Sequence, residues 1–354
     1  MQTRRLLALS AFVCLPLALA IAQEPTAPQP SKEQTMLNPW IGHWDVTATN
    51  FEGPEPVAMH AVEETTAVCG GLWLRAKVTG TDFPFSGTGF TGWDSTRNEY
   101  VGVWVDSMSA TPWTSHGKHD AKTGGFTFDG LMPSPEGART TWTTMEFPNA
   151  DTRVETTHIV DKDGKKTKFM ELRATRQKDT KTAPASAKKA DSVATDMPNP
   201  HDPMHQHLAP FAGSWKSTMK MSAPGMPEMP PSAMASEDVM VCDDLWLLTH
   251  ATGEFSGMAF EGFGLTGYDP TQKKFVSFWV DNFAAYLMQS TGTCDKSGSA
   301  FTMSGASIDM MGKPGTTIDT TKWDSKDHYV RTMVSTGKDG KDAGTMILEC
   351  TRSK

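Results

Sequence analysis

The sequence predicts an all-β protein built from two tandem copies of one domain. Three segments occur twice in the same order: residues 72–74 (LWL) return as 245–247 (LWL), 87–94 (GTGFTGWD) as 262–269 (GFGLTGYD), and 100–106 (YVGVWVD) as 275–281 (FVSFWVD). A repeat period this long indicates a pair of whole domains rather than a solenoid of small units. Between these landmarks, β-branched and aromatic runs alternate with Gly, Asp, Asn and Pro, and no long helical periodicity occurs.

The first 22 residues are expected to be a secretory signal peptide. Arg4 and Arg5 precede an apolar run over residues 6–19, and small residues end the segment at Ala22. Residues 23–36, rich in Pro, Gln and Thr, are expected to form a flexible leader. The sequence therefore predicts an exported protein, periplasmic or secreted.

Each repeat is expected to open with one short helix that leads into a strand. In the first repeat, residues 37–176, Leu37, Trp40 and Ile41 have the i, i+3, i+4 spacing of a helix; Leu208, Phe211 and Ala212 repeat it in the second, residues 205–354. A linker rich in Lys, Ala, Ser and Pro is expected between them, over residues 177–204.

The strands that follow contain two matched hairpins. Residues 94–98 (DSTRN) and 269–273 (DPTQK) place Asp at the first turn position. The strand after the first turn places Tyr100, Trp104 and Asp106 on one face and three valines on the other. Because both faces are largely apolar, the outer one needs a covering partner: the other repeat, or a second chain if the protein self-associates.

Composition excludes some partners. The formal net charge is −8, which argues against nucleic acid, since phosphate binding relies on clustered Lys and Arg. After the signal no segment is apolar enough for a membrane span. Four cysteines would remain, and they permit three disulfide pairings that the sequence does not choose among: Cys69, Cys242, Cys294 and Cys350.

These landmarks resemble a bacterial family known as domain of unknown function 1579, whose members are similar to lipocalin-type (calycin) barrels. The resemblance rests on Trp44 and Trp215 in Gly-x-Trp, the strands at Trp73 and Trp246, the Thr-Gly-Trp/Tyr-Asp hairpins, and Trp-Val-Asp. It covers nearly all of the chain after the signal, once per repeat. It implies two tandem lipocalin-like antiparallel β-barrels and supplies no established activity.

A barrel of this kind has room inside for side chains or one small ligand. The residues expected to line such a cavity are aromatic, with one polar group in each copy, which suits a small hydrophobic or amphipathic molecule: Trp104, Asp106, Trp113, Trp279, Asp281 and Tyr286. The alternative is that the tryptophans fill the core and the aspartates cap strand ends. The sequence does not identify the ligand or any cofactor.

The sequence bears on three other functions. Gly87-x-Gly89-x-x-Gly92 matches a dinucleotide fingerprint, but a hairpin follows instead of a helix, so we expect these glycines to serve close packing. His158, whose counterpart is Val334, could ligate haem if it faced a cavity. No hydrolase motif is evident, and a hydrolase or isomerase using Asp106 or Asp281 is the remote alternative.

The second repeat also concentrates methionines and histidines. Thioether and imidazole ligands suit copper, Cu(I) above all, in an oxidising compartment. The rival hypothesis is therefore a metal-binding protein that uses His205, His207, Met226, Met229 and Met234. A Pro- and Met-rich loop with ordinary packing explains the same residues without a metal.

Overall fold

A computed structural model describes residues 28–134, 136–178, 199–227, 229–255, 257–308 and 312–353. The predicted signal peptide, residues 23–27 of the leader and residues 179–198 of the linker lie outside the described residues. Within them, no helix is long and apolar enough to cross a membrane.

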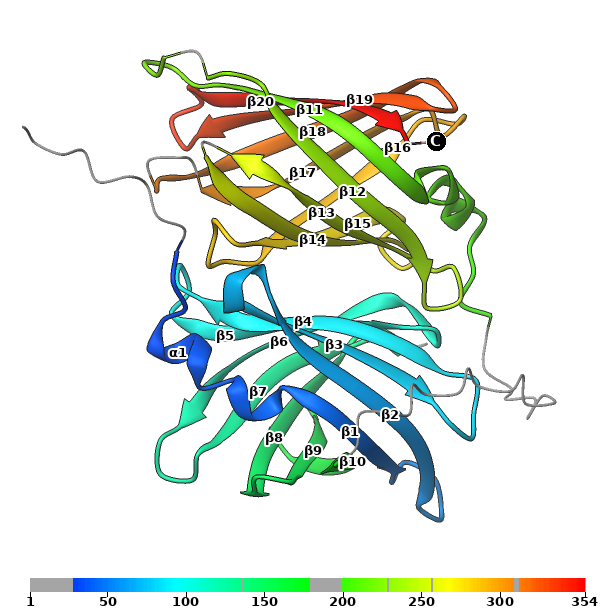
Figure 1. Cartoon of the computed structure of the whole chain (residues 1–354). Helices are drawn as coiled ribbons and strands as arrows, with labels where there is room; N and C mark the ends of the chain where they lie inside the picture. Colours follow the sequence, from blue (N-terminus) through cyan, green and yellow to red (C-terminus); the bar gives the residue numbers. More distant parts are fainter. Residues whose placement is uncertain are drawn as a thin grey trace, which may run out of the picture.

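The chain forms two closed antiparallel barrels of ten strands each, one above the other in Figure 1. Every strand pairs with the next along the chain, and the first strand of each barrel closes on the last. The first barrel comprises β1 (Gly42–Asn50), β2 (Val57–Val68), β3 (Trp73–Gly80), β4 (Ser86–Asp94), β5 (Glu99–Asp106), β6 (Ser109–Asp120), β7 (Gly125–Met132), β8 (Arg139–Asn149), β9 (Thr152–Val160) and β10 (Lys166–Arg176). The second comprises β11 (Gly213–Ser222), β12 (Ser232–Val241), β13 (Trp246–Phe255), β14 (Met258–Asp269), β15 (Lys274–Asp281), β16 (Met288–Cys294), β17 (Ala300–Ile308), β18 (Pro314–Ser325), β19 (His328–Gly337) and β20 (Asp342–Arg352).

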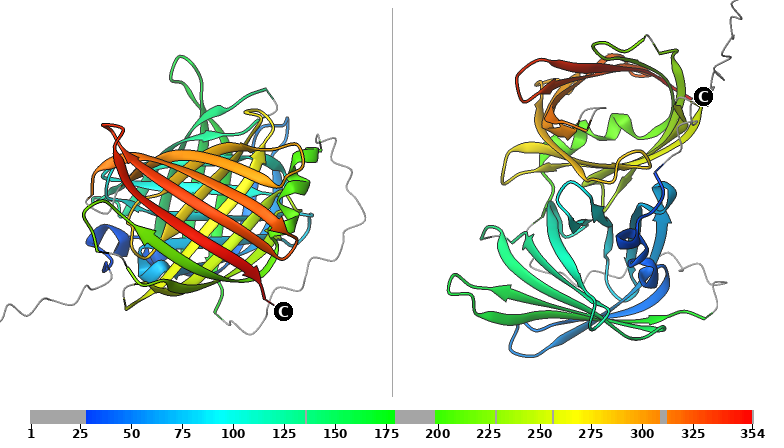
Figure 2. Two further views of the ribbon diagram at one scale, coloured as in Figure 1. Left: turned by 90° about the horizontal axis from the view of Figure 1, so that it is seen from above. Right: turned by 90° about the vertical axis from the view of Figure 1, so that its left-hand side faces the viewer.

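Short helical turns precede each barrel. They are α1 (Lys32–Thr35) and η1 (Asn38–Trp40) in the first repeat, and η3 (Pro203–His207) and η4 (Ala209–Phe211) in the second; η2 (Cys69–Gly71) joins β2 to β3. In Figure 2 (right), the light green turns lie across the ring of strands of the second barrel. We call the barrel end that carries these turns the plugged end, and the other the distal end.

The helical turns begin earlier than the predicted repeat starts at residues 37 and 205. Ser31 caps α1, and Gln34 accepts a hydrogen bond from the Ser31 backbone N–H at 2.7 Å. Asp202 and His205 make the same reciprocal contact in the second repeat, at 2.9 Å. Gln34 and His205 therefore share one capping role despite their different side-chain chemistry.

Aromatic side chains fill the plugged end of each barrel. In the first barrel, Leu37 and Trp40 pack against Tyr100, Phe126 and Phe128. In the second, Leu208 and Phe211 take the corresponding places against Tyr268, Phe275 and Phe301. Because these rings contact one another and most of them are buried, the plugged end is a packed aromatic core.

One arginine at the end of each last strand holds the plug in place. Arg176 donates to the carbonyls of Ile41 and Pro39 at 2.6 and 3.0 Å, and its guanidinium lies over the Trp44 ring. Arg352 repeats these contacts with Ala212, Pro210 and Trp215. In each barrel, the last strand is therefore hydrogen-bonded to the helical turns through one arginine.

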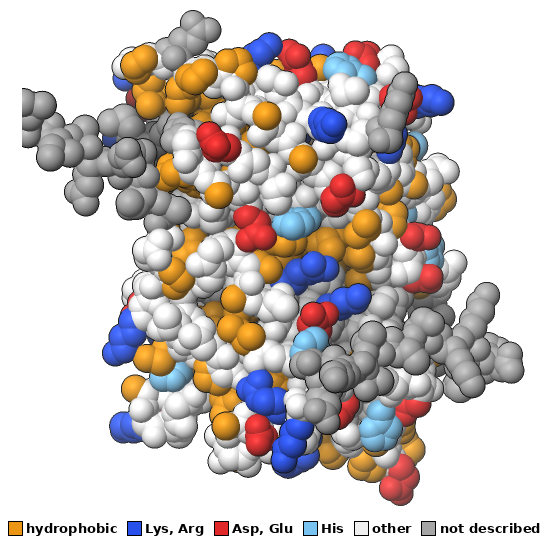
Figure 3. Space-filling model, in the orientation of Figure 1, with side chains coloured by type: hydrophobic (Ala, Val, Ile, Leu, Met, Phe, Trp, Pro, Cys, Tyr) orange, Lys and Arg blue, Asp and Glu red, His pale blue; other side chains and the backbone are white. Residues whose placement is uncertain are grey.

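The two barrels pack on each other through the outer faces of their strands. A single buried cluster contains Val101, Val103 and Val105 of β5 together with Val276, Phe278 and Val280 of β15. Phe90 meets Phe263 across the junction, with ring centroids 5.9 Å apart. Figure 3 shows apolar side chains gathered along this junction. The partner that covers the apolar outer face is therefore the other repeat.

Polar contacts also cross the junction, and equivalent residues of the two repeats make them. The thiol of Cys69 approaches the Val280 carbonyl at 3.8 Å, and that of Cys242 approaches the Val105 carbonyl at 3.6 Å. Asp94 accepts from the Leu287 N–H at 3.3 Å, whereas Asp269 accepts from the Thr111 hydroxyl at 3.1 Å. Among the described residues all four cysteines are free, so none of the three pairings that the sequence permits is formed.

The glycines of the repeated motif make room for tryptophan rings. A Cβ on Gly87 would lie 2.2 Å from Trp104, and one on Gly92 would lie 2.3 Å from Trp73. Gly262 and Gly267 stand in the same relation to Trp279 and Trp246, at 2.5 and 2.6 Å. The motif therefore serves close packing on both faces of the barrel wall, as expected, and not a dinucleotide.

Candidate ligand-binding site

The lumen of each barrel is the candidate site, and the predicted Trp and Asp residues lie at its distal end. Trp104 shares the inward face of β5 with Tyr100, while the valines of that strand face the other barrel. The Trp104 indole N–H donates to Asp106 Oδ2 at 3.0 Å, and the second carboxyl oxygen accepts from the Met108 N–H. Asp106 therefore orients the indole and closes the turn after β5.

The second barrel repeats this arrangement. Trp279 donates to Asp281 Oδ2 at 2.9 Å, and the other oxygen accepts from the N–H groups of Phe283 and Ala284. Burial raises the pKa of both Asp106 and Asp281, and the hydrogen bonds offset part of that rise. Each carboxyl thus has its hydrogen-bonding capacity committed to fixed structural donors.

The remaining two predicted residues are not counterparts. Trp113 lies directly opposite Trp104 on β6, so the two indoles share the inward face. The residue opposite Trp279 is Met288, whereas Tyr286 precedes β16 and directs its hydroxyl to the Ile308 carbonyl at 3.5 Å. The first lumen therefore carries a pair of indoles where the second has one indole and a thioether.

Charged groups that the sequence analysis did not select lie in the middle of the first lumen. Arg153 and Glu63 form a two-point ion pair at 2.8 and 2.5 Å, with both side chains almost fully buried. Burial alone would raise the pKa of Glu63, but the charge of Arg153 and its hydrogen bonds bring it below the ordinary value. Glu155, two residues along β9, has its pKa raised by burial. The charge of Arg153 offsets part of this rise.

The second lumen has a different polar set. The Arg331 Nε donates to Asp319 Oδ2 at 2.8 Å, and Nη2 contacts the same oxygen. Asp238 accepts from the hydroxyls of Thr249 and Ser236, and burial raises its pKa. Counting from the matched pair His158 and Val334, Arg331 occupies the position of Glu155, so the charge at this point is reversed.

Thioethers dominate the rest of the second lumen. Strand alternation and register place on the inward faces of the second barrel Met219, Met221, Met234, Met240, Met288, Met303, Met333 and Met346. Met221, Met346 and Met333 stand opposite one another on three neighbouring strands. Thioether side chains are flexible and polarisable, so this wall can adapt to an apolar guest.

The residues of the metal hypothesis do not come together. His205 and His207 belong to η3 at the plugged end, whereas Met226 and Met229 lie in the loop after β11, at the distal end. Those two methionines line a hollow of about 380 Å³ beside the distal ends of β11 and β20, which Met221 also lines. Met234 instead faces the lumen, against Gly253. In the described ranges no group of three or more His, Cys, Asp or Glu could hold a metal ion.

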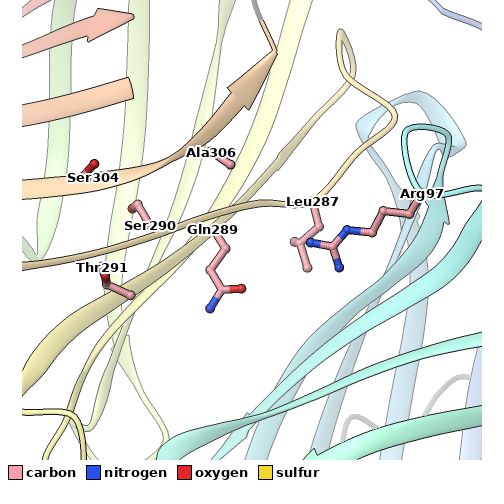
Figure 4. Close-up of a pocket in the computed structure, with 7 residues that line it drawn as sticks. All are labelled: Arg97, Leu287, Gln289, Ser290, Thr291, Ser304 and Ala306. Atoms are coloured by element: carbon pink, nitrogen blue, oxygen red, sulfur yellow. The ribbon is translucent and has the colours of Figure 1, made fainter. Parts of the chain in front are cut away.

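His158 faces away from the lumen. Arg153 and Thr157 occupy the inward face of β9, so His158 lies on the opposite face, next to Trp142. A second hollow, of about 250 Å³, lies between the barrels, where Arg97 of the first faces Leu287 and Gln289 of the second (Figure 4). It contains none of the predicted site residues.

Strand alternation is the sequence signal that comes closest to identifying the charged residues in the middle of each lumen. In β19, Tyr329, Arg331 and Met333 share one face, and Val330, Thr332 and Val334 share the other. Neither face is uniformly apolar, so alternation alone does not say which one is inward. The closure of the barrel decides it.

Two closed barrels, each with helical turns across one end and polar groups in its lumen, define an all-β protein of the lipocalin-like kind. The chain belongs to the family described as "Protein of unknown function (DUF1579)", which matches residues 29–176 and again residues 200–352. Among curated proteins no relative matches the chain.

Two solved structures are similar to it. One is a protein of unknown function from the DUF3598 family of Nostoc punctiforme, with 10% identity and a TM-score of 0.26, over 91% of this chain and 100% of that one. The other is an S-type phycobiliprotein lyase from Guillardia theta, with 12% identity and a TM-score of 0.29, over 42% of this chain and 99% of that one. The chemistry of the lumen therefore has to be derived from the residues of this chain.

Proposed function

We propose that this protein binds a small hydrophobic or amphipathic molecule in the lumen of its barrels. The observation that carries the proposal is Arg331. Its side chain points into a closed barrel yet keeps 38% of its surface accessible, so it faces a hollow inside the barrel. Thioethers and Trp279 lie on the inward faces of the same barrel, and a few fixed polar groups among apolar side chains are the usual composition of a small-molecule site.

The proposal includes an exported location, since residues 1–22 have the pattern of a secretory signal. Fractionation of the source cells tests it. The protein is expected in the envelope or the medium, with a mass reduced by that of residues 1–22. An intact chain in the cytoplasm would contradict export without affecting the binding proposal.

Native mass spectrometry of the protein purified from its own cells is the direct test. We expect an organic mass that stays bound under native conditions and is released by denaturation. Each repeat expressed alone, as residues 29–176 or 200–352, then shows which barrel holds the ligand. A chain without any bound organic mass, which also takes up none from an extract of the same cells, would contradict the proposal.

Replacing Trp279 by Leu should weaken retention of the bound molecule about tenfold or more, because the indole supplies a large apolar surface at the distal end of the lumen. Trp142→Leu is the matched control, since that indole lies on the outer face of the first barrel beside His158. The measurement is the dissociation constant of the recovered ligand by fluorescence titration. Equal effects of the two substitutions would argue against the lumen.

Copper binding is the second candidate, and the shared hollow of Met226 and Met229 is the observation that favours it. Competition with a Cu(I)-selective chelator measures the affinity. The variant Met226→Leu/Met229→Leu should lose it, because it removes two soft ligands without charge change. The matched control is Met219→Leu/Met303→Leu inside the barrel. An unchanged Cu(I) affinity in the first variant would dispose of this candidate.

A further inference from the structure

The most specific polar group in the second lumen is the guanidinium of Arg331, because part of it is not committed. An arginine carries five N–H donors on three nitrogens. Asp319 Oδ2 accepts from Nε and contacts Nη2, while in the described part of the chain Nη1 donates to no acceptor. Nη1 is thus unpaired among the described residues and yet not buried. Its N–H groups therefore open into the lumen.

Asp238 and Asp281, the other acidic groups named on the inward faces, have their hydrogen bonds with other donors. Asp238 is occupied by the hydroxyls of Thr249 and Ser236, and Asp281 by Trp279 and two backbone N–H groups. Asp319 pairs with Arg331 from one side only, and Asp238 interacts with Arg331 electrostatically without a hydrogen bond between them among the described residues. The exposed side of the guanidinium is therefore a cationic surface in the lumen.

From this anchor, thioethers line part of the wall toward the distal end, and the hydroxyls of Thr317 and Ser335 bond to each other there. Arg331 is followed on the inward face of β19 by Met333, which stands beside Met346 and Met221. β19 ends at Gly337, six positions after Arg331. This length corresponds to about 20 Å of strand, or roughly 15 Å along the axis of a tilted barrel. That depth matches a medium-length alkyl chain with its head at Arg331.

We propose that the second barrel takes an amphipathic anion, a carboxylate with an aliphatic tail, whose head group pairs with Arg331 and whose tail lies among the methionines. The proposal rests on the proposed function and narrows it to one barrel and one ligand class. Guanidinium and carboxylate suit each other because two parallel N–H···O bonds can form.

The first barrel does not offer the same site. Its arginine, Arg153, has both terminal nitrogens on Glu63, and its side chain is only 5% exposed. The position of Arg331 is held by Glu155, whose charge would repel a carboxylate. The anion is therefore confined to the second barrel, and the first barrel serves as an internal control.

The experiment compares laurate with lauryl alcohol, which has the same tail and no charge, by calorimetric titration of the full chain stripped of lipid. We expect laurate to bind about 10- to 100-fold more tightly than the alcohol, the usual range for one charge-assisted pair. Arg331→Met should remove this preference, so that laurate and lauryl alcohol bind with similar affinity. Asp319→Asn should tighten laurate binding, because it removes the competing charge.

Arg331→Met leaves Asp319 buried and unpaired, which could unfold the barrel. The double variant Arg331→Met/Asp319→Thr avoids this, so that laurate binding can still be measured. Threonine is the residue at the matching position, Thr143, of the first barrel. Glu155→Gln in the first barrel should change nothing for laurate. Equal binding of acid and alcohol in the natural chain would overturn the anion proposal and leave the proposed function standing. If neither ligand binds and the protein from its own cells carries no organic mass, both fail.

Discussion

Single residues give the two barrels different interiors on one backbone. Arg153 and Glu63 neutralise each other in the first lumen, whereas the corresponding positions of the second hold Tyr329 and Ser236. Removing one member of a buried ion pair leaves the other charge buried without compensation, which costs far more than replacing both. The pair therefore stabilises the first barrel only as a unit.

Glu63→Gln should lower the free energy of unfolding by about 3–5 kcal/mol, whereas Glu63→Met/Arg153→Met should recover most of that loss. The measurement is denaturant unfolding of the full chain, arranged as a double-mutant cycle. Glu171→Gln is the control, because its pair with Lys168 is partly exposed and worth under about 1 kcal/mol. A double variant as unstable as Glu63→Gln would show that the pair is not the cause.

The same pair predicts a pH dependence. The pKa of Glu63 is lower in the folded chain than its ordinary value of 4.5, so its contribution is complete above that pH. The contribution is lost as the pH falls through the lowered pKa, because the folded chain must then take up a proton that breaks the ion pair. The Glu63→Met/Arg153→Met chain should show a flatter stability profile below pH 4.5.

At the scale of elements, the plug and the last strand depend on each other. The indole N–H of Trp44 donates to the Trp40 carbonyl at 2.9 Å, and Arg176 covers the Trp44 ring while holding two more carbonyls of the turn. The helical turns are too short to be stable alone. Their order therefore comes from these contacts and from the aromatic packing below them.

Arg176→Met should loosen the plug of the first barrel. Hydrogen exchange of the amides of Trp40, Ile41 and Trp44 is expected to speed up about 10-fold or more, because two charge-assisted hydrogen bonds are lost. The plug of the second barrel should be unaffected. Arg173→Met, which removes an exposed arginine from the same strand, is the control. Uniform acceleration across the first barrel would instead indicate global destabilisation.

The elements that the sequence predicts best are those with local causes. The hairpins follow from Asp94 and Asp269, which accept hydrogen bonds from the residues two positions on. The start of each plug was placed too late, although Ser31 and Gln34 form a capping box that the Pro-rich surroundings concealed. The central charges of the lumen were missed because their inward direction depends on barrel closure, a property of the whole domain.

At the scale of the molecule, the repeat is a packing unit as well as a duplication. The outer faces of β5 and β15 bury their valines against each other, and the hairpins at Asp94 and Asp269 each reach the opposite barrel. Each barrel thus covers the apolar surface that the other would expose alone. This shared junction leaves the two interiors free to diverge, as Glu155 and Arg331 have done.

The junction should hold the halves together without a covalent link. A protease site placed between residues 178 and 199 and then cleaved is expected to leave one particle in analytical ultracentrifugation. Val103→Glu should split that particle into two, because it buries an unpaired charge in the shared cluster. Val334→Glu, on the exposed outer face of β19, should leave it intact. If the cleaved chain separates without the Val103→Glu substitution, the linker alone holds the two barrels together. Binding in each barrel should then be measured on the separated halves.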